Sequence, residues 1–372
     1  MKSVLLAAAA MLPVVAVTPA HAQKAGDRIA NSYICVFKGN VARGNVEAEA
    51  NRSANAAGGR VSHVYGHAIR GFAANIPDQA IERMKANNPN IAYCEQDQIM
   101  STGPIRAEAR PGGGGGTQPA QETPWGIARV NGGAAGTFGT AWVIDTGIDV
   151  THPDLNVDQS RSRSFLDRDT SYVDQNGHGT HVAGTIAALD NSIGVIGVAP
   201  GAQVVAVRVL DRRGSGTNSG VIAGVNYVAQ VGRPGDVANM SLGGGVSQAL
   251  DDAVVNAAAS SGVKFALAAG NESDNANNHS PARANGTNVY TVSASAVGDK
   301  WASYSNYGNP PVDYNEPGSS IKSTWLSGGY NTISGTSMAT PHLAGILLAG
   351  TPKASGTVSG DPDGNPDVIG SR

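Results

Sequence analysis

The chain has 372 residues, enough for two or three domains, and its 26 basic residues nearly balance its 29 acidic residues at a net charge of −3. Without any run of five basic residues, this balance argues against a nucleic-acid-binding surface. A hydrophobic content of 41% with 15% charged residues is typical of a globular protein, and two cysteines exclude both a disulfide-dense scaffold and a four-cysteine zinc site.

Residues 1–22 have the pattern of a signal peptide. Lys2 is followed by an apolar stretch from Val4 to Val17, and the small residues Ala20 and Ala22 predict cleavage before Gln23. The alternative is a membrane anchor, but about 14 apolar residues are too few for a span of roughly 20. We therefore expect a secreted or periplasmic protein that has no membrane segment after signal cleavage.

Residues 23–101 predict a small ferredoxin-like α+β module. Apolar or alternating runs indicate strands, and Ala- and Glu-rich runs indicate helices. We expect strands over 33–37, 60–65, 71–76 and 91–96, with helices over 45–55 and 77–84. Cys35 and Cys94 fall in the first and last strands, which are antiparallel neighbours in such a module. A disulfide is feasible in the right register, and the alternative, which we favour, is two small buried apolar side chains.

A Gly/Pro-rich segment over 102–122 separates this module from the rest. It contains Pro104, Pro111, five consecutive glycines at 112–116 and Pro119, and it cannot bury a core. We expect a flexible, protease-accessible linker that holds a processing site, the alternative being a simple tether.

Residues 123–350 alternate short apolar strands with Ala-rich helices, which predicts a doubly wound α/β domain with a mainly parallel sheet and helices on both faces. The expected strands are 141–144, 204–207, 237–240 and 263–268, and the expected helices are 179–190, 219–231 and 249–261. The active site of such a domain lies at the carboxyl ends of the strands. The last 22 residues, 351–372, have no periodicity, and we expect a flexible tail.

Three glycine-flanked segments carry candidate catalytic residues. Asp145 ends an apolar strand, and His178 stands at the start of a helix, as does Ser337. Taken singly, Asp145 and Ser337 could each be a helix cap. A zinc site through His178 and His181 is disfavoured, because no glutamate follows His178 and no third ligand is nearby.

The order Asp, His, Ser is that of the subtilisin triad, and Asn271 at another strand end could supply an oxyanion donor. The chain resembles the subtilisin-like serine peptidases, and within them the proteinase K-like branch, over about residues 29–350. The resemblance rests on the motifs at 145–147, 178–184 and 335–341, with 124–126 similar to the start of the mature domain.

This resemblance implies a subtilisin-like α/β fold and a secreted serine endopeptidase with broad specificity for apolar or aromatic residues before the scissile bond. It implies catalysis by Asp145, His178 and Ser337 with Asn271 as oxyanion donor, without a cofactor. It also implies that residues 23–101 are an inhibitory propeptide that the enzyme processes itself, and that the enzyme is a monomer acting on proteins and peptides. The substrate backbone would lie between two extended segments, one containing Gly214, Ser215 and Gly216 and the other Ser241, Leu242, Gly243 and Gly244. The small, uncharged residues 241–245 and 268–270, which include Ala269 and Gly270, suggest an apolar primary pocket.

The family resemblance also implies a structural calcium ion. Asp313 would bind it together with the backbone carbonyls of Thr287 and Val289, and the alternative is a solvated surface aspartate. Arg212, Arg213 and Asn218 depart from the branch at the outer substrate strand, so its distal preferences do not transfer to this chain. Two rival functions are a catalytically impaired binding homologue and a serine esterase. The first should lack a catalytic residue, and the second should lack an extended cleft and a propeptide.

Overall fold

The computed structural model describes residues 24–103, 106–107 and 118–372. The predicted signal peptide and most of the predicted linker lie outside the described residues. Within the described part of the chain, no helix is both long and apolar enough to cross a membrane.

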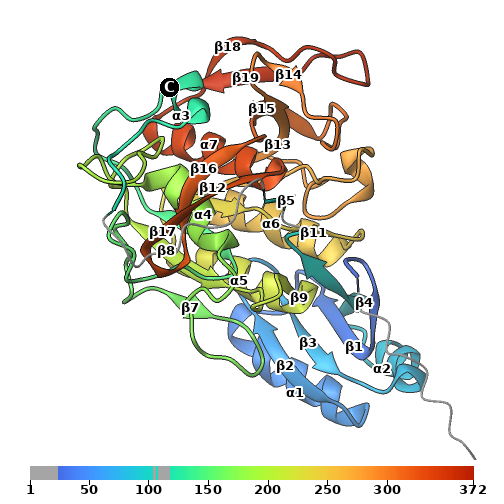
Figure 1. The fold of residues 1–372 in the computed structure, drawn as a ribbon. Coiled ribbons are helices and arrows are strands. Elements are labelled where there is room, and N and C mark those ends of the chain that lie inside the picture. The colour runs from blue at the N-terminus through green and yellow to red at the C-terminus, as the bar shows by residue number, and fades with distance from the viewer. Residues whose placement is uncertain (1–23, 104–105, 108–117) are drawn as a thin grey trace, which may run out of the picture.

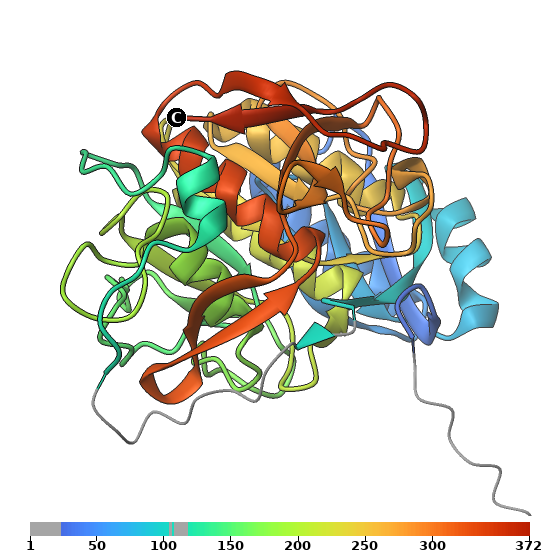
Figure 2. The same ribbon diagram turned by 45° about the horizontal axis from the view of Figure 1, so that its top comes forward.

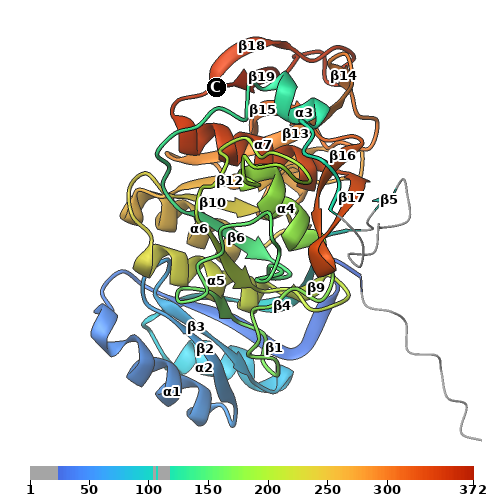
Figure 3. The ribbon, with the colours of Figure 1, turned by 60° about the vertical axis from the view of Figure 1, so that its left-hand side comes forward.

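The N-terminal module is an antiparallel sheet with two helices on one face. Its strands are β1 (Arg28–Phe37), β2 (Arg60–Tyr65), β3 (Gly71–Asn75) and β4 (Ile91–Ser101), in the spatial order β4-β1-β3-β2. The helices α1 (Val46–Ala56) and α2 (Ile81–Asn87) pack against this sheet around a core that includes Phe72 and Ile76. The ferredoxin-like prediction is thus confirmed. The opposite face of the sheet lies against α5 (Asn218–Val231) and α6 (Gln248–Ser261) (Figure 3).

The two cysteines form a disulfide, so the favoured expectation of two unpaired thiols was wrong. Cys35 and Cys94 are direct partners in the β1–β4 ladder, and their α-carbons lie 4.1 Å apart. Register decides this pairing, because a shift of one residue would turn the two side chains to opposite faces of the sheet.

The large domain is built on a mainly parallel sheet with the order β18-β19-β15-β13-β12-β10-β6-β8-β7 (Figure 1). Its central strands are nearly continuous apolar runs, as parallel sheets covered on both faces require. They are β6 (Ala141–Asp145), β8 (Val204–Arg208), β10 (Val237–Met240), β12 (Lys264–Ala268), β13 (Val289–Ala296) and β15 (Val312–Pro317).

Helices cover both faces of this sheet. On one face α4 (His178–Ala187) and α7 (Thr336–Ala349) share a core that includes Ile186 and Leu343. On the other face α5 and α6 share a core that includes Val225 and Leu250. The predicted doubly wound α/β architecture is confirmed.

Several shorter elements complete the fold. They are β5 (Arg106–Ala107), α3 (Trp125–Arg129), β7 (Arg163–Ser164), β9 (Ser215–Thr217), β11 (Gly243–Gly244), β14 (Lys300–Trp301), β16 (Ile321–Trp325), β17 (Gly329–Ser334) and the 3-10 turns Arg43–Asn45, Asp78–Ala80, Ala276–Asn278 and Leu326–Gly328.

The C-terminal residues are ordered, which corrects the predicted flexible tail. They form β18 (Lys353–Thr357) and β19 (Val368–Ser371), and β19 pairs in parallel with β15 at Ile369 (Figure 2). Ile369 is fully buried, and the backbone N–H of Arg372 donates to Val130. The edge of β15 has unpaired backbone N–H and C=O groups to which a short strand can hydrogen-bond. Composition alone does not predict such pairing, because the partner strand is distant in the sequence.

Candidate active site

Asp145 and His178 meet at the carboxyl edge of the parallel sheet. Asp145 ends β6, and His178 is the first residue of α4. The His178 Nδ1 atom lies 2.8 Å from Oδ1 and 2.9 Å from Oδ2 of Asp145, and both side chains are buried. Gly177 holds the turn before α4 at φ 107°, where an added Cβ would lie 2.4 Å from the Trp325 ring. Only glycine both adopts this positive φ without strain and leaves room for the Trp325 ring.

A second buried carboxylate, which the sequence analysis missed, supports this pair. Asp174 accepts hydrogen bonds from the backbone N–H groups of Asn176, Gly177 and Thr180 and from the hydroxyls of Thr146 and Thr180. Burial raises the pKa of Asp174, and these hydrogen bonds oppose that rise by stabilising the ionised carboxylate. Asp174 thereby connects the loop after β6 to the start of α4, and an aspartate four residues before His178 was the available sequence signal.

Ser337 and Asn271 face the same cleft from the other side. Ser337 is the second residue of α7, and its hydroxyl donates to the backbone carbonyl of Ser241 at 3.3 Å in this structure. The Asn271 side-chain oxygen accepts from the Thr336 N–H at 2.8 Å and from the Thr336 hydroxyl at 3.1 Å. Because the oxygen is held in this way, the Asn271 amide nitrogen is left to face the cleft near Gly103, where an added Cβ would lie 3.9 Å from it.

The chain's own β4 occupies the cleft as an added strand. Met100 pairs with Gly216 of β9 on one side and with Gly244 of β11 on the other. Ser101 likewise pairs with Ser215 and Gly243, and the Thr102 N–H donates to the Gly214 carbonyl at 3.1 Å. The two segments expected to hold a substrate backbone therefore flank an extended segment that ends beside Ser337.

The described chain leaves the cleft at Gly103. This residue has φ 72°, so the extended conformation ends here. Its N–H donates to the Ser101 hydroxyl, and its carbonyl accepts from the Thr102 hydroxyl, both at 3.0 Å. Both backbone polar groups of Gly103 are thus bound by the two residues that precede it.

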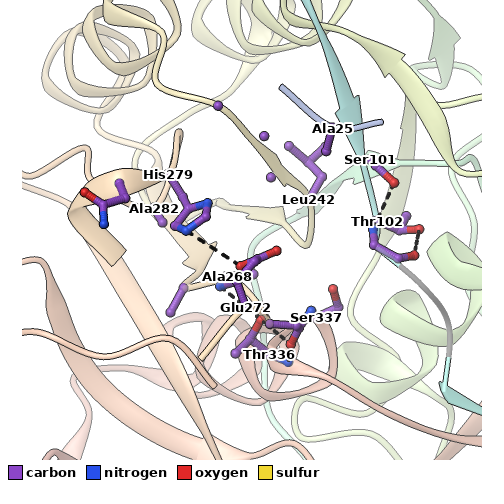
Figure 4. Close-up of a pocket in the computed structure, with 18 residues that line it drawn as sticks. Ala25, Ser101, Thr102, Leu242, Ala268, Glu272, His279, Ala282, Thr336 and Ser337 are labelled. Atoms are coloured by element: carbon purple, nitrogen blue, oxygen red, sulfur yellow. Dashed lines mark hydrogen bonds and ion pairs between the residues drawn. The ribbon is translucent and has the colours of Figure 1, made fainter. Parts of the chain in front are cut away.

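A pocket of about 210 Å³ opens beside Ser337 and Asn271 (Figure 4). Leu242, Ala268 and Ala282 line it, together with glycines 243–245 and 270. Two charged or titratable side chains that the sequence analysis did not place there, Glu272 and His279, also line it.

Glu272 and His279 are held by neighbouring polar groups. The Glu272 carboxylate accepts from the Asn306 amide at 2.7 Å, and His279 Nε2 lies 3.3 Å from the Asp274 carboxylate and 3.9 Å from that of Glu272. The wall of the pocket is therefore less uniformly apolar than its small residues alone predicted.

The predicted calcium ligands lie on β15 and around the start of its neighbour β13. Val289 begins this strand, and Asp313 on β15 accepts from the Thr291 N–H at 2.9 Å through one carboxylate oxygen. Thr287 lies in the loop just before the strand. A carboxylate and backbone carbonyls are the oxygen ligands that a hard cation binds, with waters completing its coordination. The described residues hold no cluster of three or more acidic, histidine or cysteine side chains suited to a metal.

Comparison with known proteins agrees with this fold. Residues 142–351 match the subtilase family model, and residues 19–103 match the peptidase inhibitor I9 model. The chain belongs to the subtilase family of serine proteases and carries an inhibitor-type propeptide of the I9 class.

Similar proteins include several proteases. The chain is 45% identical to alkaline serine exoprotease A of Vibrio alginolyticus, over 77% of this chain and 52% of that protein, so it spans about half the length of this relative. It is 37% identical to proteinase R of Parengyodontium album, over 86% of this chain and 79% of that protein. A solved cold-adapted subtilisin-like serine proteinase matches at a TM-score of 0.58 and 43% identity, covering 66% of this chain and 96% of that one.

Proposed function

We propose that this protein is a secreted or periplasmic serine endopeptidase, made as a self-processing zymogen. The observation that carries this proposal is the threading of β4 between β9 and β11, with Gly103 reaching the Asn271 amide beside Ser337. A cleft that holds an extended backbone on both edges suits a polypeptide substrate, whereas an esterase has no need of one.

In the proposed mechanism, Ser337 Oγ attacks the scissile carbonyl and forms an acyl-enzyme. His178 Nε2 takes the hydroxyl proton and passes it to the leaving amine, while Asp145 holds Nδ1 and stabilises the charged imidazole. Asn271 and the Ser337 N–H stabilise the tetrahedral oxyanion, with Thr336 orienting the Asn271 amide. The Ser337 hydroxyl, which donates to Ser241 in the precursor, turns to His178 when a substrate enters.

In this proposal the primary pocket accepts apolar and aromatic side chains, and residues 23–101 inhibit the enzyme until they are released. The mature enzyme acts as a monomer and needs no cofactor for catalysis. Asp313, with the carbonyls of Thr287 and Val289, would bind a calcium ion. The ion would link β15 to the start of β13 by taking ligands from both.

The test is the Ser337→Ala precursor, expressed in a host that lacks other exported proteases. We expect it to fold, to fail to react with a fluorophosphonate probe, and to accumulate with its N-terminus near Gln23, because removal of the nucleophile abolishes acyl-enzyme formation. Mass spectrometry reads the N-terminus, and Ser260→Ala, on the exposed side of α6, is the control that should react and mature normally. A Ser337→Ala protein trimmed to near residue 122 would show that another protease cuts the linker.

A further inference from the structure

Asn218 is a buried amide without a hydrogen-bond partner. It is the first residue of α5, directly after β9, and its side chain is 0% exposed. Within the described part of the chain, neither Oδ1 nor Nδ2 of Asn218 has a partner. Leaving a buried polar group unpaired is unfavourable, so such a group in a native protein calls for a functional explanation.

The position of Asn218 relates it to the side chain of Met100. β9 ends at Thr217, whose backbone is still extended (φ −128°, ψ 153°), so the next side chain, that of Asn218, leaves the chain on the face of Gly216, the direct partner of Met100 in the β4–β9 ladder. Asn218 is therefore the diagonal neighbour of Met100 on that face. Thr217 faces the other way, and its hydroxyl accepts from the Gly220 N–H at the start of α5.

Met100 fills an apolar subsite at this point. It is fully buried and belongs to the same apolar cluster as Leu242 and Val221, and an added Cβ on Gly244 would lie 2.7 Å from its sulfur. The chain reaches the Asn271 amide three residues later, at Gly103. If Gly103 marks the residue before the scissile bond (P1), Met100 occupies the P4 position, and its thioether is too weak an acceptor to satisfy an amide.

We propose that Asn218 makes the P4 subsite select side chains that form hydrogen bonds, such as glutamine, over methionine or leucine of similar size. A glutamine at P4 keeps the unbranched shape of methionine and offers both a donor and an acceptor to the Asn218 amide. The propeptide, with methionine at this position, leaves the amide unpaired and so binds less tightly than the subsite allows. This inference rests on the proposed endopeptidase function.

The test compares two peptide substrates of the mature enzyme that differ only in glutamine or methionine at P4. We expect kcat/KM to favour glutamine by about tenfold, the ratio that 1.4 kcal/mol corresponds to. In Asn218→Leu the preference should reverse, because the subsite then has apolar walls only. Asn256→Leu, which makes the same change at an exposed site on α6, should keep the wild-type preference.

Cleavage of the glutamine and methionine peptides by the wild-type enzyme tests the role of Asn218 even if Asn218→Leu does not fold. Equal cleavage of the two peptides, or faster cleavage of the methionine peptide by the wild-type enzyme, would overturn the role of Asn218 while leaving the endopeptidase function intact. Failure to cleave any peptide, with no reaction of Ser337 with the fluorophosphonate probe, would instead contradict the proposed function itself.

Discussion

Three buried histidines on α4 and α7 have different hydrogen-bond partners. His178 faces the Asp145 carboxylate, whereas His181 contacts the Ile321 carbonyl and His342 the Met338 carbonyl, each at close to hydrogen-bond length. Burial lowers the pKa of His181 to about 3 and that of His342 to about 4. Both therefore stay neutral at pH 7 as parts of the core.

These two histidines predict a loss of stability in acid. Below about pH 6.5 the histidines bind protons in the unfolded chain, whereas the buried side chains of His342 and His181 stay neutral in the folded protein. Their contribution to the free energy of unfolding therefore falls as the pH drops towards 4. Between pH 7 and pH 5 the contribution of His342 to this loss is on the order of 2 kcal/mol. Urea titrations of the Ser337→Ala precursor at pH 7 and pH 5 measure it, and adding His342→Leu should flatten the dependence. An unchanged slope in that variant would contradict this origin.

At the scale of elements, the C-terminal hairpin completes the main sheet. β19 covers the edge of β15, and Arg129 of α3 donates both to the Ser355 hydroxyl and, in a bidentate pair, to Asp299. The buried Asp367 accepts from Asn309 at 2.7 Å and from the Ser293 hydroxyl. These contacts connect α3, β13 and the chain end, so the hairpin is part of the domain.

Truncating one buried side chain of this hairpin should therefore destabilise the whole domain. Ile369→Ala removes a fully buried side chain from β19 and is expected to cost about 2–5 kcal/mol of unfolding free energy. Urea titration of the Ser337→Ala precursor is the measurement. Lys353→Ala on exposed β18 should change it by less than about 0.5 kcal/mol. Equal stability of the two variants would mean that the hairpin does not contribute to the core.

The proposed calcium ion also acts between elements, at β13 and β15. Removing it should leave Asp313 without its cationic partner and loosen the start of both strands. We expect a chelator to shorten the half-life of the mature enzyme at raised temperature, and Asp313→Asn to be equally short-lived with or without the chelator. Half-lives of wild type that do not depend on the chelator would refute the calcium site.

Over the whole molecule, the propeptide is held by strand pairing and by its own carboxylates. Asp97 accepts from the N–H and hydroxyl of Ser219 at the start of α5, and Glu95 accepts from the Ala249 N–H and the Ser247 hydroxyl at the start of α6. The N-terminal ends of helices favour such negative charges. Asn226 accepts from three consecutive N–H groups of the propeptide, those of residues 66–68.

Weakening one of these contacts should speed activation. Asp97→Asn replaces a charge-assisted acceptor, worth about 1.5–3 kcal/mol, with a neutral amide. We expect the lag before peptidase activity in the secreted protein to shorten, because the cleaved propeptide dissociates about ten- to a hundredfold faster. Glu47→Gln, on the exposed face of α1, should keep the wild-type lag. A lag that is unchanged by Asp97→Asn would exclude this carboxylate as a determinant of release.

The sequence by itself determined the features that contiguous residues encode. The apolar periodicity predicted the two folded modules, and the glycine-flanked motifs identified Asp145, His178, Ser337 and Asn271 as candidates, because each motif carries its own turn and capping chemistry. Only the tertiary structure decided what depends on partners distant in the chain. Strand register paired Cys35 with Cys94, a free sheet edge ordered the C-terminal residues, and tertiary packing buried the Asn218 amide without a hydrogen-bond partner among the described residues. No local pattern predicts such pairings, because their energy comes from residues tens to hundreds of positions away.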